Sequence, residues 1–463
     1  MPRLPLLLLL WGTSSYAFPV FQEGQRQDVE TAWKYLENYY NLGNDTEVKN
    51  LSGKELMAEK LKEMQQIFGL KVTGKSDPET LRVMSNPRCG VSDVTPEAII
   101  SNNPRWTKTH LTYSILNYTP LLPRAVVDQS IAKAFRVWSD VTPLTFSRVF
   151  DEEGDIVLAF YRGDHGDNNP FDGLSIRLAH AFQPGPGIGG DVHFDLDERW
   201  TDTSENFNLF YVTAHELGHS LGLTHSSDIG ALMFPSYTWY VDDFVLNQED
   251  INRIQALYGP SPNPIQPTGA TTPRPCDSAL TFDAITTFRG EVIFFKGRFY
   301  IRVSRAIPEP ELNLIGILWP DLPGELDAVY EASMADEAYF FKGTQFWAVR
   351  GHEEQAGYPK SIHTLGFPPT VRKIDAAVSA KETKKTYFFV DDQYWRFDEQ
   401  KRSTEPGFSR KVAKDFPGVD SKVDAVFEAF GFFYFFGGSS QLEFDPNAKK
   451  VTHVLKSNSW FNC

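Results

Sequence analysis

Four residues in the run HELGHSLGLTH give the chain its clearest chemical signal: His215, Glu216, His219 and His225. On a helix, His215 and His219 are one turn apart on one face, so two imidazole nitrogens can converge on one metal ion. Gly222 ends that helix and lets the chain turn back, which delivers His225 as a third ligand. Three neutral histidines with an open fourth position are typical of catalytic zinc. Glu216 lies where it can accept a proton from the metal-bound water.

A second candidate metal site lies upstream, where three histidines and an aspartate could form a closed structural zinc site. Unconnected surface histidines are the alternative, and spacing alone leaves both interpretations open. Acidic residues among glycines in the same stretch fit calcium loops, with a solvated acidic face as the alternative. The histidine site would use His165, Asp167, His180 and His193, and the acidic residues are Asp155, Asp172, Asp191, Asp195 and Glu198.

The elements that must position these residues belong to one predicted α+β domain, which we place at residues 97–258. Short β-like runs, such as 111–116 and 156–161, alternate there with two helical patterns. The apolar positions behind the helices are Leu209, Val212 and Ala214 before the first histidine, and Val127, Ile131, Ala134 and Trp138 further upstream.

The N-terminus predicts export from the cell. A basic start is followed by the apolar run 4–11 and by small residues up to Ala17, which is the pattern of a secretory signal peptide over residues 1–17. The apolar run is far shorter than the roughly 20 residues of a membrane-spanning helix. We therefore expect a secreted protein of the extracellular space and matrix, without a membrane span. Three sequons predict glycosylation at Asn44, Asn50 and Asn117.

Residues 18–96 carry two further helical patterns and predict a small helical domain. Its apolar stripes are Val29, Trp33, Leu36 and Tyr40 in the first helix, and Met57, Leu61, Met64 and Phe68 in the second.

A proline-rich spacer at 259–275 separates these domains from a repeat. The tetrapeptide that begins at Phe282 recurs at 326, 374 and 423, with spacings of 44, 48 and 49 residues, and an aromatic strand follows each copy. Such a period predicts a four-bladed β-propeller over residues 276–463. A disulfide between Cys276 and Cys463 would close its ring, which leaves Cys89 as an odd thiol. The repeated acidic residues are Asp283, Asp327, Asp375 and Asp424.

The net charge excludes one class of function. The chain has 45 basic and 60 acidic side chains, a balance of −15. Binding along nucleic acid depends on neutralising phosphates with basic residues, so we expect no nucleic-acid partner.

Over essentially its whole length the chain resembles the matrix metalloproteinase family. Residues 87–91, PRCGV, are similar to its cysteine switch, in which Cys89 would occupy the fourth zinc position and keep the precursor latent. Met233 fits the methionine turn of metzincin proteases. The resemblance implies a helical propeptide, a metzincin domain and a hemopexin-like propeller. It also implies a second zinc at the upstream histidines, so two zinc ions in all, and several calcium ions.

The resemblance further assigns ligands and substrate contacts. Substrate would lie extended beside residues 178–182 as an added strand. Substrate would contact Ala179, Ala181, Tyr211, Pro235 and Tyr237. One calcium site would use Asp172, Gly173, Ser175, Arg177, Asp195 and Glu198, and a second would use Asp155, Gly187, Gly189 and Asp191. In the propeller channel calcium would be held by Asp283, Asp327, Asp375 and Asp424.

Several departures from the family pattern bear on function. Ser92 stands where the switch of the family continues with proline, which we expect to loosen the backbone and weaken latency. Residues 174–177 replace a glycine-rich loop, which compromises any position that needs positive φ. Tyr211 and Phe207 replace an arginine and a tyrosine of a collagenase, so peptide hydrolysis is a safer prediction than cleavage of native collagen.

The resulting hypothesis is a secreted zinc endopeptidase, made as a latent precursor, that hydrolyses matrix proteins such as collagen and gelatin. Its expected partners are these substrates, tissue inhibitors of metalloproteinases and an activating protease. Two alternatives stay open: a weakly active matrix-binding or decoy protein dominated by its propeller, and a matrix protease that does not cut native collagen.

Overall fold

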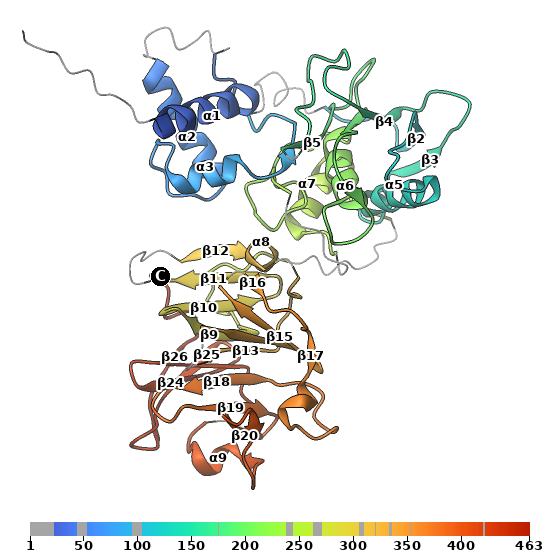
Figure 1. Ribbon diagram of the computed structural model, residues 1–463. Coiled ribbons are helices and arrows are strands. Elements are labelled where there is room, and N and C mark those ends of the chain that lie inside the picture. The colour runs from blue at the N-terminus through green and yellow to red at the C-terminus, as the bar shows by residue number, and fades with distance from the viewer. Residues whose placement is uncertain are drawn as a thin grey trace, which may run out of the picture. The chain divides into compact units, whose positions relative to one another are not determined.

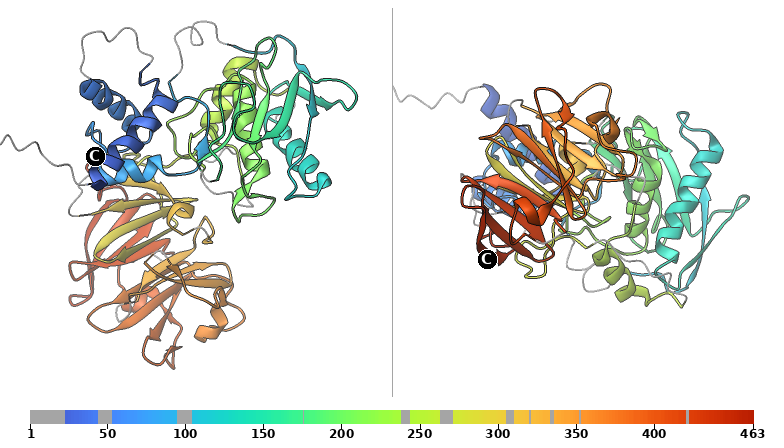
Figure 2. Two further views of the ribbon diagram at one scale, coloured as in Figure 1. Left: turned by 45° about the horizontal axis from the view of Figure 1, so that its top comes forward. Right: turned by 90° about the horizontal axis from the view of Figure 1, so that it is seen from below.

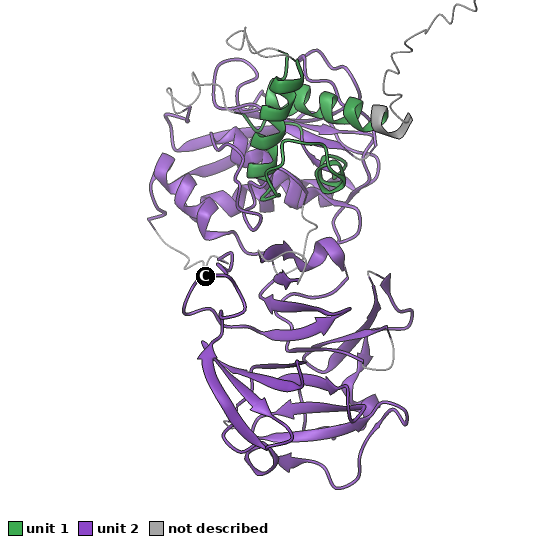
Figure 3. Ribbon diagram, turned by 90° about the vertical axis from the view of Figure 1, so that its left-hand side faces the viewer, with its two compact units in different colours: residues 1–86, 90–100 green, residues 87–89, 101–463 purple. Residues whose placement is uncertain are grey.

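The computed structural model describes most of the chain (Figure 1). The described residues are 23–43, 53–94, 104–174, 176–237, 244–262, 271–304, 310–319, 321–332, 336–351, 353–419 and 422–463. The predicted signal peptide, Asn44, Asn50 and Ser175 lie outside them. Contacts divide the chain into two compact units, residues 1–86 with 90–100 and residues 87–89 with 101–463 (Figure 3). The strand that carries Cys89 therefore belongs with the second unit, although the sequence placed it inside the helical domain.

The first unit is helical, with α1 (Glu23–Tyr40), α2 (Gly53–Ile67) and α3 (Pro78–Met84). The apolar stripe predicted for α2 is confirmed, because all four of its residues are buried. The stripe predicted for α1 is wrong at its start, since Val29 is 45% exposed. The buried face of α1 keeps the predicted Leu36 and Tyr40 and adds Ala32, Tyr35 and Tyr39.

The second unit begins with a six-stranded sheet in the order β1-β5-β6-β4-β2-β3. Neighbouring strands are parallel except β5 and β6, which are antiparallel. The strands are β1 (Arg88–Cys89), β2 (His110–Ile115), β3 (Thr145–Arg148), β4 (Ile156–Tyr161), β5 (Arg177–Ala181) and β6 (Val192–Asp195), with a separate pair β7 (Trp200–Thr201) and β8 (Phe207–Asn208).

Helices α5 (Arg124–Ser139) and α6 (Leu209–Ser220) share one core with this sheet, and α7 (Gln248–Tyr258) packs at its margin. The predicted stripe of α5 is confirmed, because Val127, Ile131, Ala134 and Trp138 have no exposed surface. All twelve residues of α6 are buried. The Trp138 indole N–H donates to the Ala214 carbonyl at 2.9 Å, which fixes α6 against α5.

The propeller consists of four antiparallel sheets, coloured yellow to red in Figures 1 and 2. Their innermost strands contact one another in a closed cycle, since β9 contacts both β13 and β23, and β18 contacts β13 and β23. The first blade is β9 (Ala284–Phe288), β10 (Glu291–Lys296), β11 (Phe299–Val303) and β12 (Glu311–Leu314), and the second is β13 (Ala328–Glu331), β14 (Ala338–Lys342), β15 (Gln345–Arg350), β16 (Glu353–Glu354) and β17 (Lys360–Ser361). The third blade is β18 (Ala376–Ala380), β19 (Lys385–Val390), β20 (Gln393–Asp398), β21 (Ser403–Thr404) and β22 (Arg410–Lys411), and the fourth is β23 (Ala425–Ala429), β24 (Phe432–Gly437), β25 (Ser440–Asp445) and β26 (Lys450–Lys456). Short helices also occur in this region: α8 (Ile315–Leu318), η1 (Ile362–Leu365) and α9 (Val412–Asp415).

Paired phenylalanines join each blade to the next. One ring of each Phe-Phe pair packs toward the preceding blade and the other toward the following blade, as edge-to-face contacts show between Phe295 and Phe340 and between Phe389 and Phe435. The aromatic excess of the sequence thus forms the blade interfaces.

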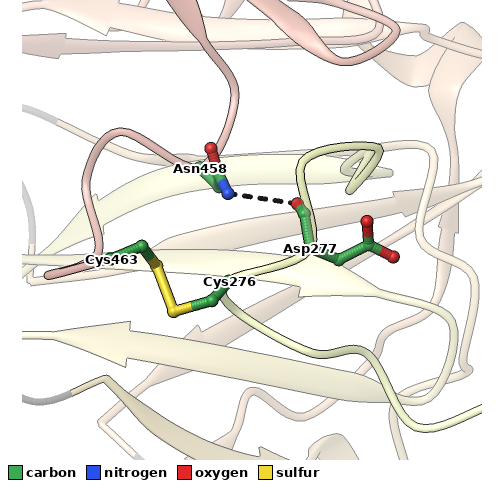
Figure 4. Close-up of a disulfide and its surroundings, with 4 residues drawn as sticks. All are labelled: Cys276, Asp277, Asn458 and Cys463. Atoms are coloured by element: carbon green, nitrogen blue, oxygen red, sulfur yellow. Dashed lines mark hydrogen bonds between the residues drawn. A yellow bond between two sulfur atoms is a disulfide. The ribbon is translucent and has the colours of Figure 1, made fainter.

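The predicted disulfide is present and joins the first blade to the last (Figure 4). Cys276 and Cys463 have Cα atoms 5.5 Å apart. Beside them the Asn458 side-chain amide donates to the Asp277 carbonyl at 3.1 Å. Within the described ranges, no helix has the length and apolar character needed to cross a membrane.

Candidate metal centre and substrate cleft

Helix α6 presents His215, Glu216 and His219 from a buried position. The helix begins where the Asn208 side chain accepts the Tyr211 N–H at 3.1 Å, a typical N-cap. It ends at a turn that requires glycine, because Gly222 has φ of 103° and a Cβ there would lie 2.2 Å from the Pro104 carbonyl oxygen. This turn directs the chain back toward the helix and brings in His225.

Backbone carbonyls orient the imidazoles of this cluster. His215 Nδ1 lies 2.7 Å from the Leu232 oxygen, and His219 Nδ1 lies 2.8 Å from the Leu223 oxygen. Each contact places the ring proton on Nδ1 and directs the Nε2 lone pair into the cluster. His219 Nε2 is buried and has no hydrogen-bond partner among the described residues. Burial lowers the pKa of His219 well below its usual value, so the ring stays neutral, as a metal ligand must.

The three rings converge with a cysteine on one point. One ligand atom each from Cys89, His215, His219 and His225 all lie within 4.8 Å of one another. Three neutral imidazoles and a thiol in this arrangement fit a tetrahedral zinc ion. The cluster predicted from the sequence is therefore assembled, together with the thiol that only the family resemblance had placed there.

Glu216 lies against this cluster with 1% of its surface exposed. The Cys89 thiol donates to its carboxylate across 3.5 Å between Sγ and Oε2. Burial raises the pKa of Glu216 to about 8, and the hydrogen bond from Cys89 opposes that rise. A proton affinity in this range suits a group that must accept and return a proton near neutral pH.

A peptide slot lies beside the cluster and already holds the segment 87–89. Strand β1 pairs in parallel with β5, and Arg88 N donates to the Ile176 carbonyl at 2.7 Å. On the other side, Cys89 N donates to the Pro235 carbonyl at 3.0 Å, and Tyr237 N donates to the Pro87 carbonyl at 2.8 Å. Extended peptide in this slot is bonded through its main chain on both sides.

A pocket opens at the slot, with Cys89, His215 and Glu216 in its lining. The Tyr211 ring forms part of its wall and makes edge-to-face contacts with Tyr237 and Phe244. Among the predicted substrate contacts, Tyr211, Pro235 and Tyr237 line this pocket, whereas Ala179 and Ala181 lie in β5. Its lining includes Leu178, from the segment 178–182 expected beside the substrate, and residues that had not been named for substrate: Val212, Phe234 and Ser236.

The upstream histidines and aspartate also form one cluster, and unconnected surface histidines are excluded. Asp167 Oδ2 lies 2.8 Å from His165 Nε2, 2.8 Å from His180 Nε2 and 2.9 Å from His193 Nδ1. Ligands 2.0–2.1 Å from a tetrahedral zinc are about 3.3 Å apart, whereas these atoms lie 2.8–2.9 Å apart. What fits a metal ion is the convergence of one ligand atom from each of the four residues. Burial lowers the pKa of His180 to about 3 and keeps the ring neutral.

One predicted calcium site gathers buried acids. Asp195 and Glu198 have no exposed surface, and Asp195 Oδ2 lacks a hydrogen-bond partner in the part of the chain that the structure describes. Burial, reinforced by the charge of Asp172, raises the pKa of Asp195 to about 6. A buried carboxylate oxygen of this kind fits a hard cation. Asp172 itself accepts the Arg177 N–H at 3.1 Å, and Gly173 adopts φ of 83°.

The replaced loop does not strain the backbone at two of its described positions. Leu174 and Arg177 avoid positive φ, so the expected conflict is absent at these two positions. The Arg177 guanidinium instead donates to Asn169 Oδ1 at 2.7 Å and to the Pro170 carbonyl at 2.8 Å. A side chain therefore closes this loop.

The second predicted calcium site is less complete. The Asp155 carboxylate is occupied by Lys108 Nζ at 2.6 Å and by Thr112, and Asp191 Oδ1 accepts the Val157 N–H at 2.9 Å. Any contribution of Asp155 to calcium would therefore come from its carbonyl. Gly187 has φ of 68°, and a Cβ at Gly189 would lie 2.4 Å from the Gly185 oxygen, so both glycines are needed for the loop.

The four propeller aspartates share a structural role. In each blade the Oδ2 atom accepts a backbone N–H from the hairpin between the second and third strands, at 2.6 to 2.8 Å. Calcium ligation by these residues would therefore fall to their carbonyls and stays a prediction. The four bonds join Asp283 to Gly297, Asp327 to Gly343, Asp375 to Asp391, and Asp424 to Gly438.

Asp250 is a residue that the sequence analysis missed. From α7 its carboxylate accepts the N–H groups of Leu232 and Met233 at 2.6 and 3.2 Å, and thus holds the turn whose Leu232 carbonyl orients His215. Burial raises the pKa of Asp250 to about 7, against the lowering effect of those two N–H groups. An acid in the first turn of a helix is common, so the sequence offered no signal of this contact.

The Asn117 side chain is engaged with backbone. Its amide nitrogen donates to the Phe160 carbonyl at 3.0 Å, and its oxygen accepts the Phe160 N–H at 2.7 Å. Glycosylation at this position stays a prediction.

A buried carboxyl at a histidine cluster, beside a slot that holds extended peptide, is what hydrolysis of peptide bonds at a metal requires. The fold and the site thus define a zinc metalloendopeptidase. Family comparison agrees: the Matrixin profile matches residues 105–259, the Hemopexin profile matches 282–324, 326–369, 374–421 and 423–463, and a putative peptidoglycan binding domain profile matches 25–84.

The chain belongs to the matrixin family of zinc-dependent endopeptidases. It is 71% identical to interstitial collagenase A of Mus musculus, with all of both chains covered. It is 60% identical to interstitial collagenase of Equus caballus, over 100% of this chain and 99% of that protein. Stromelysin-1 of Mus musculus is 56% identical over the full length of both.

Proposed function

We propose that this protein is a secreted collagenase, made as a latent precursor, that cleaves collagen and gelatin with Glu216 as general base. The observation that carries the proposal is the convergence of Glu216 with three imidazoles and a peptide slot. Zinc would be held by His215, His219 and His225. The names and full-length identity of the collagenase relatives support collagen as the substrate.

The chain's own residues divide the reaction among them. Zinc, when bound, would polarise the scissile carbonyl and acidify a water molecule. Glu216 accepts the proton of that water at its carboxylate and returns it to the leaving amine. The carbonyls of Leu232 and Leu223 keep His215 and His219 in the tautomer that can bind metal. The Ile176 and Pro235 carbonyls hold the substrate main chain in the slot.

Latency follows from the same geometry. Segment 87–89 fills the peptide slot and places the Cys89 sulfur at the cluster, so it excludes both substrate and water. Cys89 is 6% exposed, so external reagents reach the thiol only when the segment moves. An activating protease that cuts between Cys89 and Arg105 would release this segment, and tissue inhibitors would bind the cleft that it vacates.

The remaining metals have structural roles in this proposal. His165, Asp167, His180 and His193 would hold a second zinc, because the three rings and the carboxylate leave no open position. Calcium would bind the buried Asp195 and Glu198, with the neighbouring loop residues 172–177 supplying further oxygens.

The test uses activated wild type and Glu216→Ala with two substrates, a short fluorogenic peptide and native type I collagen. Wild type should cleave both. Glu216→Ala should keep zinc, measured by elemental analysis, yet lose at least about a hundredfold in turnover, because general-base catalysis contributes about 10²–10⁴. Glu205→Ala, at an exposed position of the same domain, is the matched control and should retain activity.

Each other outcome has a definite meaning. Near wild-type turnover by Glu216→Ala would refute the assignment of the base. Cleavage of the peptide alone by wild type would retain the endopeptidase and reject the collagenase. Cleavage of neither substrate, with zinc bound, would favour a matrix-binding protein dominated by its propeller.

A further inference from the structure

A single side chain of helix α7, that of Arg253, binds the loop that carries the third histidine. Its Nη2 atom donates to the Thr224 carbonyl at 2.9 Å and to the Thr224 hydroxyl oxygen at 2.8 Å. It also donates to the His225 carbonyl across 3.3 Å. Three oxygens of two consecutive residues therefore surround one guanidinium nitrogen. Arg253 lies 28 residues beyond His225, so this contact comes from the fold and not from the connectivity of the loop.

The helix that presents Arg253 is anchored in the core of the catalytic domain. Ile251 and Ile254 of α7 are buried in the same core as Leu217 of α6. Glu249, one turn before Arg253, places its Oε1 atom 3.9 Å from Nη1 on the other side of the guanidinium. The core that sets the position of His215 and His219 on α6 therefore also sets the position of Arg253.

The two carbonyls that Arg253 binds determine where the His225 side chain points. The Thr224 carbonyl belongs to the peptide plane before the His225 Cα, and the His225 carbonyl belongs to the plane after it. Because each peptide unit is planar, fixing both planes fixes φ and ψ of His225 and thus the direction of its Cα–Cβ bond. The chain alone leaves these two angles open.

The neighbours of these carbonyls also serve the cluster. The residue before Thr224 is Leu223, whose carbonyl orients His219 at 2.8 Å from Nδ1. The residue after His225 is Ser226, whose N–H donates to the Met233 carbonyl at 2.8 Å. The contact with Arg253 thus lies in the middle of a segment whose two ends are already bound.

We propose that Arg253 is a positioning residue for the zinc centre, whose guanidinium holds the two carbonyls that flank the His225 Cα and so keeps the third imidazole at the cluster. The inference rests on zinc ligation by His225, proposed above. The guanidinium is also a positive charge near a cation site, and by Coulomb repulsion alone it would weaken zinc binding. Positioning and charge therefore predict opposite effects when Arg253 is removed.

The test measures how fast zinc passes from the activated enzyme, with its propeller in place, to the chelator pyridylazoresorcinol. His225→Ala removes a ligand and so identifies which released ion belongs to this cluster. Arg253→Ala should release that ion at least about tenfold faster than wild type, because residues that orient metal ligands contribute about 10–100-fold to metal affinity. Arg253→Lys keeps the charge and a donor but lacks the planar fork, and its rate should lie between the two.

Arg105→Ala is the matched control. Arg105 Nη1 donates at 2.8 Å to the Leu257 carbonyl, so this variant also removes a bond between a guanidinium and a carbonyl at α7, but outside the loop 224–226. It should release zinc like wild type. A second measurement is the rise in melting temperature that zinc causes, which should be smaller for Arg253→Ala than for the control. A general loss of packing would lower the melting temperature equally with and without zinc.

Three results would overturn the role of Arg253: equal or slower zinc release by Arg253→Ala, an equal acceleration by Arg105→Ala, or an unchanged zinc-induced rise in melting temperature. If His225→Ala retains both zinc ions as wild type does, the ligand assignment in the proposed function fails instead.

Discussion

At the scale of single residues, burial sets the proton affinity of the groups that would meet metal. Each histidine cluster contains a ring that burial keeps neutral, since burial depresses the pKa of His219 in one and of His180 in the other. The same burial acts in the opposite direction on acids, as Glu216 and Asp195 show with pKa values of about 8 and about 6. Buried carboxylates without a cation are costly, so ion binding at Asp195 should depend on pH.

Calcium should stabilise the protein more at pH 7.5 than at pH 5. Folding raises the Asp195 pKa from 3.8 to about 6, so without calcium this residue contributes less stability as pH rises through that window. Calcium binds the ionised form and must displace a proton below about pH 6, which costs up to about tenfold in affinity per pH unit. The measurement is the difference in melting temperature with calcium and with a chelator at both pH values.

Asp195→Asn should abolish most of the calcium effect and its pH dependence. Asp202→Asn, an exposed acid of the same domain, should leave both unchanged. A calcium-induced shift in melting temperature that is equal at the two pH values would contradict the role assigned to Asp195.

At the scale of elements, helix α6 must approach the turn at Met233 closely. A Cβ at Gly218 would lie 2.2 Å from the Met233 sulfur and 3.0 Å from Trp138 Cζ2. Both neighbours have no exposed surface, so neither can move into solvent. Glycine is therefore required in the middle of this helix, despite its low helix propensity.

Gly218→Ala should destabilise the catalytic domain and weaken its zinc retention. Overpacking in a tight core costs about 1–3 kcal/mol, which exceeds the gain of up to about 1 kcal/mol from helix propensity. We expect a melting temperature lower by several degrees and faster loss of zinc on dialysis. Gly185→Ala is the control, because its Cβ would meet nothing closer than 3.7 Å. An increase in stability for Gly218→Ala would show that the turn at Met233 can move to accommodate the added methyl group.

Elements also show what the sequence could predict. Helices α2, α5 and α6 could be predicted from apolar residues spaced at 3.6 residues per turn, and the blades from a sequence repeat with a period near 45 residues. Both signals can be read from the order of residues along the chain. The pairing of β1 with β5 and the hydrogen bonds from Leu232 N and Met233 N to Asp250 join residues that are far apart in the chain. No local sequence pattern at these positions predicts either contact. The stripe of α1 failed at Val29 for the same reason, since its packing partners decided which face is buried.

At the scale of the whole molecule, the propeller closes by two means. Aromatic side chains of the first and last blades share one core, in which Phe282, Phe294 and Phe436 pack together. The Cys276–Cys463 disulfide and the bond from Asn458 to Asp277 lie at the same seam. The seam is thus held by packing as well as by a covalent bond.

Removal of the disulfide should lower the stability of the propeller without affecting peptide hydrolysis. The bond spans 187 residues, for which the chain-entropy model gives about 5 kcal/mol, while the shared aromatic core still favours a closed ring. We expect the double variant Cys276→Ser, Cys463→Ser to unfold its propeller at a clearly lower temperature by calorimetry. Its activated form should hydrolyse a short peptide like wild type.

Asn458→Ala removes one hydrogen bond at the same seam and should lower the free energy of unfolding by about 1 kcal/mol. A double variant no less stable than Asn458→Ala would assign ring closure to the aromatic core alone.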